Sequence, residues 1–198
     1  MTSTDICNLA LSYISSNTIQ SIDENTETSR KCKQHYEHTK KMALQDFNWG
    51  FAKRQEKLAL VDGANVNQYD YAYIKPENCL QIRRIYSEYD QNDSLVKHKY
   101  DVYSLDDNTP VIVCDIENAY IEYTYDIKDA AVFTSQFIEA LARYLASNLA
   151  MPIVGNTAIQ QMQYQLYQME LLKAKRHAAK ERDRVLERPN SYVKARWC

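Results

Sequence analysis

The sequence predicts an α+β fold, with an antiparallel bundle of about four helices, an inserted antiparallel β-meander or small barrel, and an extended C-terminal arm. Apolar residues recur at helical spacing in residues 1–53 and 128–172, but at a spacing of two in residues 54–127. The connections between the alternating runs are too short for the crossovers that parallel strands need. The last helical pattern continues into residues 173–198. We therefore expect a helical core in two pieces, one inserted β subdomain, and a basic protruding helix that leads into the arm.

Two helices are predicted before the β subdomain. The first carries a single apolar stripe, and Thr2 and Asp5 have the spacing of a capping box. The second runs from about Thr26 to Phe47, and Gly50 is expected to cap its C-terminal end. Its predicted buried stripe is Cys32, Tyr36, Thr39, Ala43 and Phe47, and its predicted solvent-facing lysines are Lys31, Lys33, Lys40 and Lys41.

Five or six short antiparallel strands are predicted in residues 54–127, separated by turn residues. This region holds ten of the sixteen tyrosines of the chain. Tyrosine covers a half-exposed sheet face and still satisfies its hydroxyl group, so it favours a sheet that packs against neighbouring subunits. The residues predicted to make such contacts are Tyr69, Tyr71, Tyr73, Arg83 and Arg84. The two arginines also fit a solvated sheet edge.

Two further helices are predicted after the strands. Asp129 is expected to cap the first, which ends at Pro152 and Gly155. Asn156 begins the second, which can continue to Arg188. The predicted buried stripe of this last helix is Ile159, Met162, Leu166 and Met169. Its second half has almost no apolar residues to bury, so that half must protrude or find a partner.

The charge is distributed unevenly. Residues 173–198 carry nine lysines and arginines against three acids, a net charge of +6, whereas the other 172 residues carry −8. A basic arm on an acidic body indicates an anionic or polar partner, although a solvated helix end has the same composition. The arm ends with side chains of the kind that anchor interfaces. The residues predicted to dock are Arg182, Arg184, Arg188, Tyr192, Val193, Arg196 and Trp197.

The sequence excludes nucleotide chemistry of the P-loop and dinucleotide-binding types. The three glycines of the chain form neither a P-loop nor a dinucleotide-binding motif, and no nucleophile elbow or zinc-protease helix occurs. No segment has the length of apolar sequence that a membrane helix needs, and the N-terminus lacks the features of a signal peptide. We expect no cofactor, no metal and no membrane anchor. The five cysteines lack a CxxC pair, and we expect reduced thiols with the first four in the core.

A few side chains resemble sites but have simpler interpretations. Cys32, His35 and His38 are too widely spread around a helix to share one ion, and no fourth ligand is near. His98 lies in a predicted strand with no acid at a fixed spacing. Asp106 and Asp107 lie where a hairpin turn favours aspartate. We expect no catalytic residue and no metal ligand among them.

The order of the segments resembles tail tubular protein A and related head-to-tail adaptors of short-tailed bacteriophages. The stretches that carry the resemblance are 6–11 followed by 21–24, 43–52, 71–80 and 137–146. The resemblance implies a dodecameric ring beneath the portal, through which double-stranded DNA passes without sequence specificity and below which a nozzle docks. It implies a virion location in the neck or tail after assembly in the host cytoplasm, a ring formed by the helical core, and C-terminal segments that grip the portal.

The expected function is therefore that of a structural virion protein and not of an enzyme. The alternative is a nucleic-acid-binding protein that uses the basic arm as an electrostatic track and the tyrosines as a stacking platform. Against it, the body is acidic and no basic residues alternate with Tyr69, Tyr71 and Tyr73. A small enzyme without a recognisable motif is a third, weaker alternative.

Overall fold

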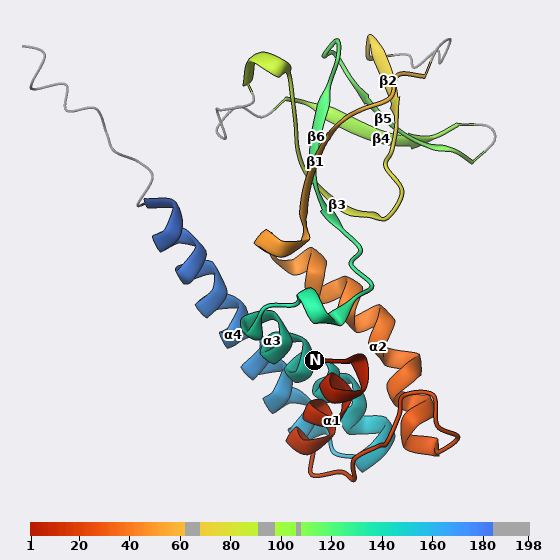
Figure 1. Cartoon of the computed structure of the whole chain (residues 1–198), viewed down its shortest axis with the longest axis vertical. Helices are drawn as coiled ribbons and strands as arrows, with labels where there is room; N and C mark the ends of the chain where they lie inside the picture. Colours follow the sequence, from red (N-terminus) through yellow and green to blue (C-terminus); the bar gives the residue numbers. More distant parts are fainter. Residues whose placement is uncertain (62–67, 91–97, 106–107, 184–198) are drawn as a thin grey trace, which may run out of the picture.

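The structure, a computed structural model, describes residues 1–61, 68–90, 98–105 and 108–183. It is an α+β protein with two lobes stacked along its long axis (Figure 1). The helical lobe contains the four α-helices, and the β lobe contains the strands between residues 53 and 125. One long helix runs along the side of the helical lobe and extends beyond it (Figure 1).

The helical lobe is built around helix α3 (Ser135–Leu149). Helices α1 (Ser3–Tyr13), α2 (Glu27–Asp46) and α4 (Thr157–Asp183) all pack against it. Its core combines aliphatic residues of every helix with an aromatic cluster of Trp49, Phe51, Phe133 and Phe137. Burial of this shared core stabilises the four helices together, because an isolated helix of this length is only marginally stable.

Three of these helices begin where they were predicted to begin, each at a residue that caps it. Thr2 and Asp5 form the capping box of α1, with the Asp5 amide donating to Thr2 Oγ1 at 3.2 Å. Thr26 accepts from the Ser29 amide at the start of α2, and Asn156 accepts from the Ala158 amide at the start of α4. These starts can be predicted because the hydrogen bonds join residues two or three positions apart.

Two predicted caps are wrong. Asp129 caps a separate 3-10 turn, η3 (Ala130–Val132), and Thr134 caps α3. Gly50 does not end α2, which passes into extended backbone at Phe47; Gly50 instead begins the 3-10 turn η1 (Gly50–Ala52). In both places a short 3-10 turn separates the long helix from the sheet, and a continuous apolar pattern conceals such a break.

The link between α3 and α4 ends as predicted. A π-helical turn, η4 (Ala150–Val154), follows α3, and Gly155 then takes a left-handed conformation with φ 68°. Glycine suits this position because it has no Cβ to clash in the left-handed region. The chain therefore reverses at Gly155 and returns along α3 as α4.

The strands are antiparallel, but their order is not that of the predicted meander. They are β1 (Lys53–Lys57), β2 (Tyr71–Ile74), β3 (Cys79–Tyr86), β4 (Tyr100–Ser104), β5 (Pro110–Cys114) and β6 (Tyr120–Tyr125). One sheet has the order β1-β6-β3 and the other β2-β5-β4. The first and last strands pair, with Lys53 opposite Thr124, so the β lobe leaves the helical lobe and returns to it at one place. Strand alternation indicates faces but not partners, so it cannot distinguish this order from a meander.

The two sheets share one apolar core. It contains Tyr73, Ile82, Ile85, Ile112 and Ile121, from strands of both sheets. The central strands β5 and β6 are buried on both faces over most of their length. Four cysteines, Cys7, Cys32, Cys79 and Cys114, are unpaired and buried, as predicted, whereas Cys198 lies outside the described residues.

Polar contacts fix the β lobe to the end of α2. The Arg83 guanidinium donates from Nη2 to the carbonyl oxygens of Leu44, Gln45 and Phe47 at 2.9–3.2 Å, and from Nε to Thr124 Oγ1 at 2.8 Å. A guanidinium suits this place because its several donors can reach carbonyls at a helix end, where the regular bonds of the helix stop.

The prediction that Lys40 faces water is wrong. Its side chain is 1% exposed, and its Nζ lies 2.9 Å from Glu37 Oε2 and 3.4 Å from Asp126 Oδ1. Neither the ammonium nor Asp126 Oδ1 has hydrogen-bond geometry, so the groups interact as charges. Asp126 directly follows β6, and this buried charge pair therefore lies at the junction of the two lobes.

Candidate interaction site

An uncharged surface lies on the outer side of α4. From Thr157 to Leu172 every exposed residue of this helix is uncharged. Met162, Met169 and Leu172 are each about half exposed, at 49%, 53% and 53%. The single charged residue in this stretch, Glu170, is partly buried and pairs with Lys173 at 2.6 Å. We call the set Met162, Gln165, Leu166, Met169 and Leu172 the neutral face of α4.

The exposed side of α2 shows what a solvated helix of this chain looks like. Most of its exposed residues are charged: Glu27, Arg30, Lys33, Glu37, Lys41 and Asp46. Solvated helix surfaces are ordinarily polar and charged, whereas the buried centres of protein interfaces lack charge and are enriched in methionine and tyrosine. The neutral face of α4 therefore has the composition of an interface.

The predicted buried stripe of α4 is wrong for Met162 and Met169, although Ile159 packs, partly buried, against the helical core. This correction explains the neutral face. The residues that pack on the lobe are Gln163, Tyr167, Leu171 and Ala174, roughly a third of a turn away from the predicted stripe. Met162 and Met169, which the spacing assigns to the core, are exposed. Both stripes have the spacing of a buried helix face, and the helix can bury only one of them against α3.

Polar partners select the rotation of α4. Gln163 accepts from Arg143 Nη1 at 3.1 Å and donates to the Tyr13 carbonyl at 3.0 Å. Arg143 also donates to Glu139 at 3.0 Å and stacks on the Tyr13 ring at 3.6 Å. Burial, together with the hydrogen bond to Glu139, raises the pKa of Tyr13 to about 12, so its phenol stays protonated and donating.

A second anchor acts one turn further along α4. The Tyr167 ring stacks on Tyr144 with centroids 4.4 Å apart, and its hydroxyl donates to Asp46 Oδ2 at 2.6 Å. Burial and this hydrogen bond raise the pKa of Tyr167 above its usual range. Because Gln163 and Tyr167 both have their hydrogen-bond partners within the helical lobe, Met162 and Met169 must face outward.

A shallow cavity flanks the other side of α4. It has a volume of about 340 Å³ and lies between α3 and α4. Its lining is Tyr144, Ser147, Asn148, Gln160, Gln161 and Tyr164. These side chains are hydroxyls, amides and aromatic rings without any acid or base, so the uncharged character of the outer side of α4 continues into the groove beside it.

The tyrosines predicted to contact other subunits are only partly on the surface. Tyr73 is 2% exposed and donates to the Ile116 carbonyl at 2.6 Å, so its ring belongs to the core between the sheets. Tyr71 is half-buried beside it. Tyr69 is half-buried on the other face, and its hydrogen bond to Asp101 raises its pKa to about 12. Tyr69 and Tyr71 thus remain partly accessible.

The two arginines predicted for intersubunit contacts are engaged within the chain. Arg83 binds the end of α2, and Arg84 lies 3.4 Å from Glu122 Oε2 and stacks over Tyr86 at 4.3 Å. Their strand, β3, does lie at the edge of its sheet, but both side chains are half-buried or more, so the prediction of a solvated edge is wrong in its solvation. In the sequence, Arg83 lies within an apolar run. Such a position fits a buried arginine with a polar partner as well as it fits a sheet edge.

A cluster of Ser87, Asp90 and His98 was not expected from the sequence. His98 Nε2 lies 2.8 Å from Asp90 Oδ2, and Ser87 Oγ donates to the same oxygen. These contacts hold the pKa of Asp90 below its usual range. The arrangement does not activate a nucleophile, because the serine donates to the carboxylate and not to the imidazole.

The remaining candidates lie apart or outside the described residues. Cys32 is in the core, whereas His35 is half-buried and His38 exposed, and the described part of the chain holds no cluster of three metal-binding side chains. Arg182 lies in α4, without a described side chain. The others outside the described residues are Asp106, Asp107, Arg184, Arg188, Tyr192, Val193, Arg196 and Trp197.

A scan against models of protein families gave no match, and no match was found among curated proteins. Across the described residues, no helix combines the length and the apolar character that crossing a membrane requires.

The neutral face is the site that the sequence interpretation missed. Its signal is present in the charge distribution: residues 151–172 contain one charged residue in a chain that is 25% charged. A fully buried helix would also lack charged residues. Only the packing of Gln163 and Tyr167 shows that one side of α4 is exposed.

Proposed function

We propose that this chain is a structural subunit of a head-to-tail adaptor ring, which joins the portal of a short-tailed phage to its tail. The observation that carries the proposal is α4, which has an uncharged outer face along the lobe and then continues as a helix to Asp183. At 1.5 Å per residue its 27 residues span about 40 Å. Of its described side chains beyond Ala174, those of Lys175, Arg176 and His177 are exposed.

The architecture supports a division of labour. In this proposal the four helices form the antiparallel bundle of the ring, residues 1–53 and 128–172, and line or border the DNA channel. The β lobe, residues 54–127, faces the neighbouring subunits or the distal tail. The basic segment 173–198 is the arm that docks on the portal.

The alternative of nucleic-acid binding has less support. A stacking platform needs exposed aromatic faces beside basic residues. Of its three proposed tyrosines, Tyr73 is in the core and Tyr69 is bonded to an acid, Asp101. The basic arm by itself fits either portal docking or nucleic-acid binding, and the experiment below distinguishes the two.

The arm is tested with purified portal rings of short-tailed phages and with duplex DNA. A chain truncated before Lys173 should keep its helix and sheet signals but lose capture by the portal. Trp197→Ala should weaken portal binding by about 2 kcal/mol or more, because buried aromatic anchors dominate interfaces. Neutralising Arg182, Arg184 and Arg188 should mainly slow association and change its salt dependence.

Phe51→Ala is the control for a loss of portal binding that is caused by instability alone. Phe51 lies in the aromatic cluster of the helical lobe, far from the arm in the sequence. The substitution should reduce stability, but the folded fraction should still be captured by the portal. Undiminished portal capture by the truncated chain would contradict the proposal. Capture of DNA but not of portal, lost on truncation, would favour the nucleic-acid-binding alternative.

A further inference from the structure

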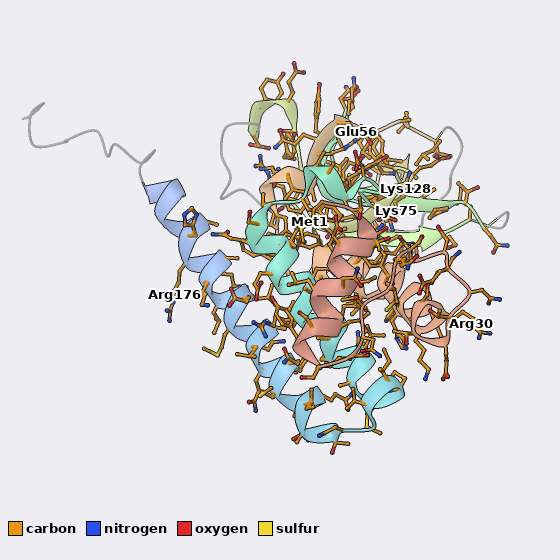
Figure 2. All side chains as sticks on the ribbon, turned by 60° about the horizontal axis from the view of Figure 1, so that its bottom comes forward. Met1, Arg30, Glu56, Lys75, Lys128 and Arg176 are labelled. Carbon is orange, nitrogen blue, oxygen red and sulfur yellow. The ribbon has the colours of Figure 1, made fainter. Side chains whose placement is uncertain are left out.

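Two buried thiols of the helical lobe lie against each other. Cys7 of α1 and Cys32 of α2 are each 0% exposed and belong to the same apolar core. The Cys7 thiol donates a hydrogen bond to the Cys32 sulfur. Figure 2 shows α1, which begins next to Met1, in front of the helical lobe and beside the first turns of α2, where Arg30 is labelled. The fold therefore holds two sulfur atoms from different helices in contact.

The other pair of buried thiols shows that a shared core does not by itself bring sulfur atoms together. Cys79 and Cys114 both lie in the core of the β lobe. Cys114 Sγ donates to the Ile116 carbonyl at 4.0 Å, and no hydrogen bond among the described residues joins it to Cys79. Burial raises the pKa of both thiols. Buried thiols of this kind are unreactive, so the contact between Cys7 and Cys32 distinguishes the two pairs.

We propose that Cys7 and Cys32 are a disulfide-forming site, which closes when the folded chain meets a small-molecule disulfide such as oxidised glutathione. The structure shows the reduced form, with both thiols unpaired. The bridge joins α1 covalently to α2 and closes a loop over residues 8–31. This site goes beyond the adaptor function and does not depend on it.

The hydrogen bond between the thiols sets the order of the two chemical steps. Accepting this bond lowers the pKa of Cys32, although burial opposes the effect. The same bond, together with burial, raises the pKa of Cys7 above its usual range. The thiolate is the nucleophile in thiol–disulfide exchange, so Cys32 attacks the reagent first and Cys7 closes the bridge.

The exchange transfers two electrons from the chain to the reagent. The Cys32 thiolate breaks the S–S bond of the reagent, forms a mixed disulfide and releases one half of the reagent as a thiolate. The Cys7 sulfur then displaces the other half and forms the bond to Cys32. The two cysteine protons end on the two released thiolates, so the products are one protein disulfide and two reagent thiols.

The reagent reaches the two thiols only when α1 moves away from the lobe. α1 has 11 residues, and a short helix can open locally while the rest of the structure stays folded. Hydrogen bonds to the connection that follows α1 resist this opening: Asn8 Nδ2 donates to the Ile19 carbonyl at 2.9 Å, and Asn8 Oδ1 accepts from the Ile19 amide at 2.8 Å. We therefore expect slow oxidation that is limited by opening, and that Asn8→Ala accelerates by about fivefold.

Peptide mapping after oxidation tests the site. The full chain, in a Cys198→Ser background that leaves only the four buried thiols, is incubated with oxidised glutathione, alkylated and digested. We expect mass spectrometry to find a linked pair of peptides that contain Cys7 and Cys32, whereas Cys79 and Cys114 stay free as the matched control. Closing the loop should raise the melting temperature by about 5 °C, and dithiothreitol should reverse the rise.

Single substitutions in the same background test the roles of the two thiols. Cys7→Ser should accumulate the mixed disulfide on Cys32 about tenfold faster than Cys32→Ser accumulates it on Cys7. Neither variant should gain thermal stability on oxidation. Unchanged circular dichroism in both variants ensures that folded chains are compared.

Three outcomes would overturn the proposal or its parts. A folded chain that keeps Cys7 and Cys32 reduced, while the urea-unfolded chain oxidises, overturns the site, and so does equal oxidation of all four buried thiols. Equal rates for the two single variants overturn the order of attack. Because these measurements use neither portal nor DNA, they can fail while the adaptor function stands, and the reverse also holds.

Discussion

A single buried lysine shows how much one residue contributes at the junction of the lobes. Lys40 lies between Glu37 and Asp126 with a side chain that is 1% exposed. We expect Lys40→Met to lower the free energy of unfolding by about 3 kcal/mol, because it leaves the Asp126 carboxylate buried beside only Lys41 at 3.6 Å. Urea denaturation measures the change.

The double variant Lys40→Met/Asp126→Leu should recover most of this loss, since removing both charges of a buried pair is often neutral. Lys41→Met is the control, because its side chain is 49% exposed and the expected cost is at most about 1 kcal/mol. An equal loss for Lys40→Met and Lys41→Met would show that burial of the pair does not matter.

Glu122 makes the stability of the β lobe depend on pH. It is 6% exposed in the central strand β6, and Lys53 and Gln55 reach its Oε2 at 2.9 and 2.8 Å. Burial raises the pKa of Glu122, but the hydrogen bonds and the charges of Lys53 and Arg84 outweigh it and hold the pKa below its usual range. The stabilisation is therefore complete above the ordinary glutamate pKa and is lost as the pH falls through the lower folded value.

We expect Glu122→Gln to lower the free energy of unfolding by about 2 kcal/mol at neutral pH. The difference from the natural chain should shrink as the pH falls below about 4. Denaturation across a pH series measures it, with the exposed Glu117→Gln as control. A difference that is constant from pH 7 to pH 3 would mean that the charge of Glu122 contributes nothing.

At the scale of the elements, the turn between α3 and α4 determines how the long helix returns. Gly155 has φ 68°, and a Cβ at this position would meet open space, so a side chain there would strain the backbone and not clash. We expect Gly155→Ala to cost about 1–2 kcal/mol. Gly50→Ala is the matched control, since its Cβ also meets open space and its φ is not positive. Thermal denaturation of both variants checks the pair, and equal melting temperatures would contradict the strain.

The packing of the helices also explains why α4 buries one of its two stripes and exposes the other. Leucine and methionine can face either the core or a partner, but Gln163 and Tyr167 have fixed polar partners on α1, α2 and α3. An unpaired buried amide or phenol costs more than a half-exposed methionine, so the polar contacts determine the rotation.

At the scale of the whole molecule, the two ends of the β lobe lie side by side. The lobe can therefore be deleted and the residues that flank it joined directly. Lys53 pairs with Thr124, so a short glycine-serine linker can join residue 53 to residue 126. Asp126 must be kept as the partner of Lys40. We expect the shortened chain to keep its helical circular dichroism, although α2 loses the capping by Arg83, and to bind portal rings while failing to attach the distal tail component.

Attachment of the distal tail by the shortened chain would refute a tail-facing β lobe. A chain that retains the β lobe but carries Arg54→Ala, an exposed change at the cation–π contact with Tyr125, serves as the control that should still attach the tail.

Much of the fold was determined by the sequence alone, wherever the cause is local. Thr2, Thr26 and Asn156 begin helices through bonds to amides two or three residues away, and Gly155 ends one through its own backbone freedom. The change from helical to alternating spacing separated the helices from the strands for the same reason, since each period reports which side of a single element is buried.

Only the tertiary structure decided which elements meet. Strand order, the burial of Lys40, the cap that Arg83 supplies to α2 and the outward neutral face of α4 all depend on residues tens of positions apart. A periodic pattern states that a stripe is apolar but not what covers it, because hydrophobic burial has no direction or specific partner. For α4, hydrogen bonds of Gln163 and Tyr167 made that choice, and they left Met162 and Met169 exposed.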